Sequence, residues 1–150
     1  MNPNPNSNPN ADSTRPDPPP ADATADCHVL GGGGVGATAA RRLRAAGHAV
    51  SVVDELHDPS ETTGVRGDPA DPRTLVEADV PEGATVVVAT ASDRRNLLIA
   101  QLVRAHLDAA RIVVLVNDRG RLDAFAAADY ETVCATTALS DGLVDVVGEA

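Results

Sequence analysis

Residues 27–36 read Cys-His-Val-Leu-Gly-Gly-Gly-Gly-Val-Gly, a short apolar run that leads into a cluster of glycines. Gly31, Gly33 and Gly36 fit the spacing G-x-G-x-x-G, and an alanine-rich segment with helical periodicity follows at once. In such a strand–loop–helix unit the first glycine allows a tight turn, the second lets the backbone approach a pyrophosphate, and the third lets the helix pack closely on the strand. The free N–H groups at the start of the helix would then face the anion. Glycine-rich loops also serve as plain flexible turns, so the rest of the chain must decide between these interpretations.

The composition suits one α/β domain preceded by a tail. Of the 150 residues 43% are hydrophobic but only 1% are aromatic, so the core must consist of Val, Leu, Ile and Ala, as in a sheet covered by helices. Residues 1–25 hold seven of the eleven prolines, are rich in Asn and Asp, and carry almost nothing apolar. We therefore expect a disordered tail over 1–25 and one folded domain over 26–150. A plain solvated extension is favoured for the tail over a tether for a partner.

The charge balance argues against two classes of partner. The net charge is −10, every basic residue is Arg, and Asp outnumbers Glu by 16 to 6. Such a surface repels phosphate backbones and anionic lipids, so we expect no binding to nucleic acid. The sequence contains neither a run of 18 apolar residues nor the pattern of a signal peptide. We therefore expect a cytoplasmic protein without direct membrane insertion.

An acidic surface without lysine also indicates adaptation to high salt, because screening by salt removes self-repulsion. We expect the melting temperature to rise with KCl concentration in a thermal-unfolding series. A melting temperature that stays flat from low to molar KCl would contradict this halophilic interpretation.

Apolar runs alternate with helical patterns along the chain, which predicts a Rossmann-like, doubly wound parallel sheet of about six strands with right-handed crossovers. The strands are expected at 26–30, 49–53, 64–66, 84–89, 112–116 and 132–134, and the helices at 35–46, 72–77, 93–107, 121–128 and 139–147.

Asp54 gives the glycine cluster a more specific meaning. It lies eighteen residues after Gly36, at the end of the second predicted strand. An acid at this place can accept hydrogen bonds from the 2′- and 3′-hydroxyls of a ribose, and it would repel a 2′-phosphate. The site therefore favours NAD or NADH, allows ADP or ATP, and disfavours NADP. The alternative for Asp54 is that it is merely an exposed acid at a strand end. Glu55, the neighbouring candidate for cofactor binding, is alternatively only a solvated acid.

Two further loops contribute candidates for cofactor binding. Gly67 and Asp68 lie in a loop near the expected adenosine side, although an ordinary turn with a capping Asp explains them equally well. Thr90, Ala91 and Ser92 follow the fourth predicted strand, where the strand order of such sheets reverses and ligands bind. Ser92 is equally well explained as the cap of the next helix.

Signals for chemistry are weak. The four histidines form no His-x-x-x-His pair and the two cysteines no Cys-x-x-Cys pair, so we predict no metal site, and Cys27 and Cys134 are expected to be buried free thiols. Tyr130 is the only tyrosine, lysine is absent, and there is no Gly-x-Ser-x-Gly motif, so we predict no catalytic residue. A minimal NAD-dependent oxidoreductase, or a fragment of one, is the alternative to a binding module; the chain is short for a second, substrate-binding domain.

Several segments together resemble the TrkA N-terminal domain, also called the RCK or KTN domain (regulator of potassium conductance). The resemblance covers roughly residues 27–133. Its most specific parts are Val65 to Pro72, close to the family's GDATDP segment, and Thr90 to Asn96, close to T-x-x-D-x-x-N. The other matching segments are 28–36, 52–55 and 112–118.

The resemblance implies a regulatory domain that binds NAD(H) or an adenine nucleotide and adds Gly34, Val35 and Asn96 to the candidate site. It further implies a homodimer or higher homo-oligomer, and a membrane subunit of a potassium transporter or channel as partner, which would hold the domain at the inner face of the membrane. Two departures stand out. Leu115 occupies a position where the family often has an Arg near the nucleotide, and a Gly and Pro usual after residues 127–129 are missing.

Overall fold

The structure, a computed structural model, describes residues 25–149. The predicted disordered tail lies outside the described residues except for Ala25. That residue is buried, and its carbonyl accepts a hydrogen bond of 3.2 Å from Nε2 of His28. The folded part therefore includes at least one residue that we had expected in the tail.

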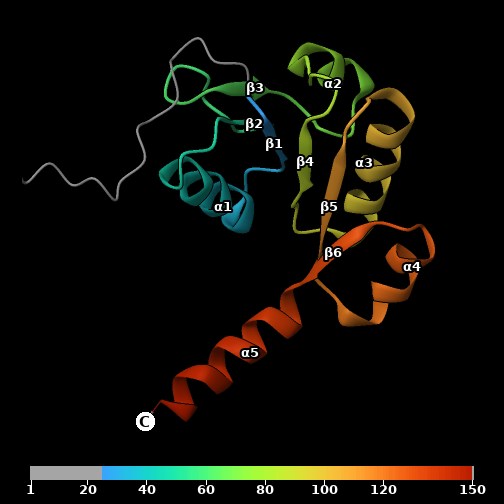
Figure 1. The fold of residues 1–150 in the computed structure, drawn as a ribbon. Helices are drawn as coiled ribbons and strands as arrows, with labels where there is room; N and C mark the ends of the chain where they lie inside the picture. The colour runs from blue at the N-terminus through green and yellow to red at the C-terminus, as the bar shows by residue number, and fades with distance from the viewer. Residues whose placement is uncertain (1–24, 150) are drawn as a thin grey trace, which may run out of the picture.

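Six parallel strands form one sheet in the order β3-β2-β1-β4-β5-β6, which confirms the predicted fold class (Figure 1). The strand order reverses between β1 and β4, so the carboxyl ends of these two strands flank the switch point. In chain order the strands are β1 (Cys27–Leu30), β2 (Val50–Asp54), β3 (Gly64–Arg66), β4 (Thr85–Val88), β5 (Arg111–Val116) and β6 (Glu131–Cys134).

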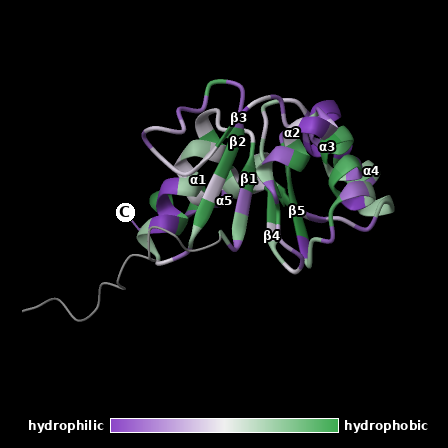
Figure 2. Cartoon of the chain, turned by 90° about the horizontal axis from the view of Figure 1, so that it is seen from above, coloured by the Kyte–Doolittle hydropathy of each residue, from purple (hydrophilic) through white to green (hydrophobic). Residues whose placement is uncertain are grey.

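Helices cover both faces of the sheet, with α1 on one face and α2, α3 and α4 on the other (Figure 2). The side chains of Asp71 and Ser92 cap α2 and α3 by accepting hydrogen bonds from the backbone N–H groups of Arg73 and Arg95. Of the two roles considered for Ser92, the structure therefore shows the helix cap. The helices are α1 (Gly34–Ala45), α2 (Pro72–Ala78), α3 (Asp93–His106), α4 (Leu122–Ala127) and α5 (Ala135–Gly148), with a 3-10 turn η1 (Arg119–Arg121) before α4.

The core has two parts because the strands are buried on both faces. The larger part packs Leu30, Val88 and Val114 against α2, α3 and α4, and it contains Phe125 at 1% exposure. The smaller part, under α1, contains Val29 and other aliphatic residues of β1 and β2. This pattern explains why continuous Val-rich runs predicted the strands correctly.

The carboxyl-terminal segment differs from the prediction. α5 begins at Ala135 rather than at residue 139, because Cys134 takes the N-cap position and the helix starts before its first large apolar residue. Cys134 is also only half-buried, contrary to the prediction of two buried thiols; Cys27 is buried. Hydrogen bonds from Thr137 lower the pKa of the Cys134 thiol, whereas burial raises that of Cys27. α5 extends away from the rest of the domain (Figure 1).

Candidate functional site

The glycine loop joins β1 to α1 through two contacts that exclude side chains. Gly31 has a φ of +105°, and a Cβ there would lie 2.8 Å from Cγ2 of Thr90. A Cβ at Gly36 would lie 1.8 Å from the carbonyl oxygen of Gly31, so only glycine lets α1 approach the loop this closely. These two glycines therefore fix the path of the loop by allowing its backbone to approach α1 and Thr90 closely.

Gly33 and Gly34 belong to the same loop but face open space. A Cβ at either position would meet no atom within 4 Å. Gly33 is the N-cap of α1, and no side chain caps this helix start. The first N–H groups of α1 are thus left for a ligand or solvent, and the helix dipole favours an anion there.

Asp54, the last residue of β2, holds the loop and still faces the cavity. Its Oδ1 accepts a hydrogen bond of 3.0 Å from the backbone N–H of Gly32, and its Oδ2 accepts one of 3.0 Å from Leu56. A carboxylate has about four lone-pair sites, so two further hydrogen bonds can be accepted from a ligand. Asp54 is therefore more than an exposed acid at a strand end.

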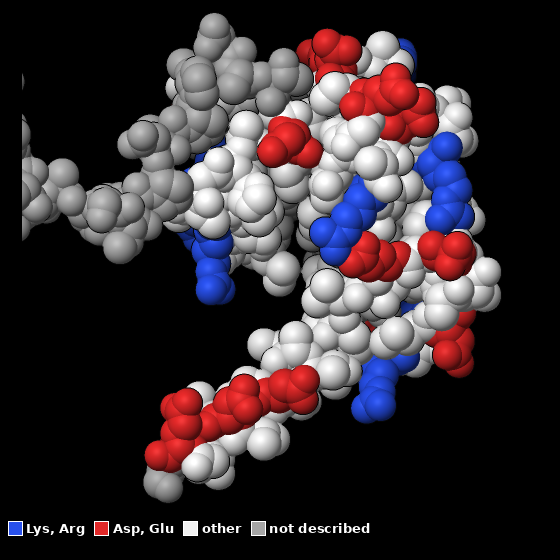
Figure 3. All heavy atoms as spheres, in the orientation of Figure 1, with Lys and Arg blue, Asp and Glu red and all other residues white. Residues whose placement is uncertain are grey.

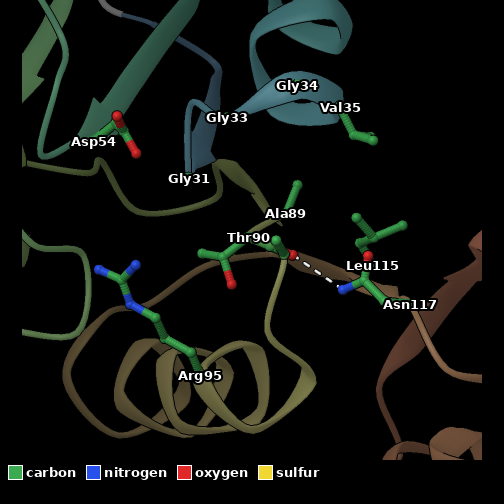
Figure 4. Close-up of a pocket in the computed structure, with 11 residues that line it drawn as sticks. Gly31, Gly33, Gly34, Val35, Asp54, Ala89, Thr90, Arg95, Leu115 and Asn117 are labelled. Carbon is green, nitrogen blue, oxygen red and sulfur yellow. Dashed lines mark hydrogen bonds between the residues drawn. The ribbon is translucent and has the colours of Figure 1, made fainter.

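A cavity of about 330 Å³ opens between the glycine loop and the end of β4 (Figure 4). It lies at the carboxyl ends of the strands beside the switch point, and its volume is in the range of small-molecule sites. The predicted residues that line it are Gly31, Gly33, Gly34, Val35, Asp54, Thr90 and Ala91. A hollow of about 390 Å³ at the opposite end of β5 and β6 contains none of the predicted residues.

The remaining predicted residues do not line this cavity. Gly36 packs α1 onto the loop, and Gly67 packs on Thr74 of α2, whose Cγ2 would lie 2.8 Å from a Cβ at that glycine. Glu55 and Asp68 instead form ion pairs with Arg95. Of the last two, Ser92 caps α3, and Asn96, in the first turns of α3, is bonded to the loop between β4 and α3.

Asn96 fixes that loop from inside. Its side chain is fully buried, at 0% exposure. Oδ1 accepts hydrogen bonds from N and Oγ1 of Thr90 at 2.9 and 2.5 Å, and Nδ2 donates to the carbonyl oxygens of Thr90 and Leu115, both at 3.0 Å. Asn96 thus positions Thr90 and joins β4 to β5.

A second polar contact fixes the other side of the cavity. The carboxylate of Asp93 accepts hydrogen bonds from the backbone N–H groups of Asn117 and Asp118, at 2.7 and 2.8 Å. The amide of Asn117 donates to the carbonyl oxygen of Thr90 at 3.1 Å, as the dashed line in Figure 4 shows. The walls made by β4 and β5 are therefore held together before any ligand binds.

Four lining residues were not among the predicted site residues, namely Ala89, Arg95, Leu115 and Asn117. Of these, only Leu115 had been placed near the nucleotide, by the resemblance to the family. The signal for Leu115 and Asn117 was the alternation of side chains between the two faces of the sheet along β5 and past its end. It can be used only once β5 is known to lie beside β4. The signal for Arg95 was its place on the first turn of the helix that follows the switch point.

Arg95 extends from α3 toward the side of the cavity where Asp54 lies (Figure 4). Its Nη2 contacts the carboxylates of Glu55 and Asp68, the latter at 2.6 Å. The hydrogen bond from Arg95 lowers the pKa of Asp68, and the same bond raises the pKa of Arg95. Both groups therefore stay ionised, and the pair bridges α3 and the loop after β3.

Within residues 25–149, no cluster of three or more His, Cys, Asp or Glu side chains is arranged to hold a metal ion. In the same part of the chain, no helix has the length and apolar character needed to cross a membrane.

The fold and the cavity together define a Rossmann-type domain with a glycine-rich loop at its switch point. The family model of the TrkA-N domain matches residues 27–136, which is most of the chain. The chain therefore belongs to the TrkA-N domain family.

One curated relative is about twice as long as the segment that matches this chain. The Trk system potassium uptake protein TrkA homolog of Methanothermobacter thermautotrophicus is 31% identical over an alignment of 104 residues, and the match covers 65% of this chain and 48% of that protein. The chain thus spans about half the length of the curated relative that it matches.

Solved structures share the fold. The NAD(P)-binding domain of an exopolyphosphatase-related protein from Archaeoglobus fulgidus is 24% identical with a TM-score of 0.74, covering 85% of this chain and 100% of that one. The GsuK channel bound to NAD is 21% identical with a TM-score of 0.59, covering 81% of this chain and 23% of that one. At these identities the likeness concerns the fold alone.

Proposed function

We propose that this chain binds NAD or NADH, or alternatively ADP or ATP, in the cavity at the switch point and reports the bound nucleotide to a potassium transporter or channel. The observation that carries the proposal is the carboxylate of Asp54, held at the edge of the cavity beside the uncapped start of α1. The helix start suits a pyrophosphate, and the carboxylate suits the hydroxyls of a ribose.

The composition of the cavity favours sensing over catalysis. Among the residues that the structure describes, Asp54 and Arg95 are the only ones with ionisable side chains that line it. Both are engaged, since Asp54 holds the glycine loop and Arg95 is paired with two carboxylates. A general acid or base must be within hydrogen-bond reach of the proton that it transfers, whereas these two side chains are already bonded to protein groups. The names of the relatives support the rest of the proposal, because one is a potassium uptake protein and another is a channel bound to NAD.

Titration with NAD, NADH, ADP, ATP and NADP, followed by thermal unfolding, tests the proposal. A ligand at 100 times its dissociation constant adds about 2.7 kcal/mol to the free energy of unfolding. We expect a shift with NAD and a much smaller one with NADP. No shift with any of the five would overturn the proposed function, and hydride turnover with a screened substrate would favour an oxidoreductase.

Asp54→Asn is expected to weaken NAD binding about 10- to 100-fold, because hydrogen bonds to a charged acceptor contribute about 1.5–3 kcal/mol. The preference for NAD over NADP should shrink at the same time, since the repelling charge is gone. Calorimetric titration measures both constants. The matched control is Asp108→Asn, an exposed acid near the amino ends of the strands, which should bind like the wild type. Equal NAD affinity in both variants would remove Asp54 from the site.

We also propose that the chain forms a homodimer through α5. Leu139, Leu143 and Val146 lie on one side of this helix and are 68–70% exposed. The acids Asp141 and Asp145 lie on the opposite side, in the acidic stripe along α5 in Figure 3. A helix of 14 residues that contains glycines and several valines is marginal in water without packing, so its apolar side needs a partner surface.

The sheet offers such a surface. By the register of β5 with β6, Val133 pairs with the buried Leu115 and points to the face of the sheet that carries α1. Val133 is 49% exposed. Each copy would thus carry both an uncovered helix and an uncovered part of a sheet, which is the self-complementary arrangement that a two-fold dimer requires.

Leu143→Asp should shift the protein toward monomers, because a charge would be buried in the apolar interface. We expect the dimer dissociation constant to rise about 100-fold or more, measured by sedimentation velocity over a concentration series. Asp145→Asn, on the acidic side of α5, should leave the association unchanged. A wild type that is monomeric at all concentrations would contradict the dimer.

A further inference from the structure

Arg95 presents a planar group to the cavity in a fixed orientation. Glu55, directly after β2, and Asp68, two residues after the end of β3, both accept a hydrogen bond from its Nη2. The N–H bonds of a guanidinium lie in its plane, so these carboxylates approach its edge and do not cover its faces. The side chain of Arg95 is 33% exposed and lines the cavity on the side of Asp54.

The cavity has no aromatic ring that could stack on a base. Within the described residues, Phe125 is buried in the core, and Tyr130 lies near the other end of the strands. The Arg104 guanidinium carbon lies 3.9 Å from the centre of the Tyr130 ring, so the chain already uses arginine against an aromatic ring there. Asn117 is the other planar side chain that lines the cavity, but its amide is bonded to Thr90 and Asp93 away from Asp54.

We propose that the free face of the Arg95 guanidinium stacks on the adenine of the bound nucleotide, with Glu55 and Asp68 as positioning residues that fix the plane. This inference rests on the proposed function. It gives Glu55 and Asp68 a role at the adenosine side without direct contact to the ligand. The local charge also favours a neutral base over a phosphate here, because two carboxylates pair with the Arg95 guanidinium and a third, that of Asp54, lines the same cavity.

The direct test follows the side-chain Nε–Hε signal of Arg95 in ¹⁵N-labelled wild-type protein, assigned by its loss in Arg95→Lys. A base stacked on the guanidinium should move the Hε resonance upfield through its ring current. NAD and ADP should produce this shift, and nicotinamide mononucleotide, which has no adenine, should not. A downfield shift on NADP alone would mean that Arg95 contacts a 2′-phosphate instead, which would overturn the inference.

Arg95→Lys keeps the charge and the pairing with Glu55 and Asp68 but removes the plane. We expect NAD and ADP to bind about three- to tenfold more weakly, in line with the strength of cation–π contacts, while nicotinamide mononucleotide binds unchanged. Arg94→Lys is the matched control, because Arg94 is exposed on the same turn and does not line the cavity.

The outcomes separate this inference from the proposed function. If the wild type binds none of the nucleotides, the proposed function is overturned and the stacking with it. If NAD binds the wild type and Arg95→Lys equally well, or binds without an upfield shift of the Arg95 Hε, the stacking alone is wrong.

Discussion

Gly36→Ala is expected to destabilise the domain severely, whereas Gly33→Ala should leave it folded and remove nucleotide binding. A Cβ at Gly36 would lie 1.8 Å from the carbonyl oxygen of Gly31, and neither backbone segment can move without separating α1 from β1. We expect the free energy of unfolding to fall by more than about 3 kcal/mol, a large part of the total stability of a small domain.

Gly33 differs from Gly36 in its surroundings although both belong to the same motif. Its φ of −73° suits any residue, and a Cβ there meets no atom within 4 Å. Gly33→Ala should therefore change the free energy of unfolding by less than about 1 kcal/mol. The methyl group would occupy the space that a pyrophosphate needs, so the NAD-induced rise in melting temperature should disappear.

Urea unfolding of the two variants, with and without NAD, measures both effects. Gly148→Ala, in the last turn of α5 and on the acidic side of that helix, controls for the general effect of replacing glycine in a helix and should be neutral or slightly stabilising. A Gly36→Ala protein as stable as the wild type would refute the close contact between α1 and the loop. Normal NAD binding by Gly33→Ala would place the pyrophosphate elsewhere.

The fold could be predicted from the sequence because its strands carry a strong local signal. Residues such as Val86 to Val88 form continuous apolar runs, and these runs arise where a parallel sheet is covered on both faces. The glycine spacing and Asp54 were likewise predictable, because one strand–loop–helix unit and the next strand fix their positions over a short stretch of chain.

The interactions of Arg95 could not be predicted in the same way. They join three segments, at residues 55, 68 and 95, whose proximity depends on the whole sheet order. For this reason Glu55 and Asp68 were predicted to contact the nucleotide, whereas the structure pairs both with an arginine. The spacing of residues along the chain identifies acidic residues at strand ends, but it does not show which basic side chain each of them pairs with.

The position of α5 shows a second limit. Its apolar periodicity predicted a helix, and the structure contains one. An apolar stripe does not show whether the surface that covers it lies on the same chain or on another. Leu139 and Leu143 are exposed in the single chain, and the proposed dimer would cover them.

Asn96→Ala is expected to have the second largest effect on the domain. The side chain is fully buried and makes four hydrogen bonds, to Thr90 N, Oγ1 and O and to Leu115 O. Alanine would leave buried backbone groups without partners, at a cost of about 1–3 kcal/mol for each group that stays unsatisfied. The carbonyl of Thr90 keeps its bond from Asn117, which limits the damage there. We therefore expect a total loss of about 3–5 kcal/mol.

The same substitution separates a positioning role for Asn96 from direct contact with a ligand. The resemblance to the family placed Asn96 among the cofactor-binding residues, but the structure buries it behind Thr90. Hydrogen exchange of the Thr90 amide should accelerate in Asn96→Ala, because Oδ1 is its acceptor. Ser92→Ala is the control, since it removes only the cap of α3 and should cost about 1 kcal/mol. If both variants lose equal stability and the Thr90 amide stays protected, the loop between β4 and α3 is held by other contacts, and Asn96 becomes a candidate for direct contact with the nucleotide again.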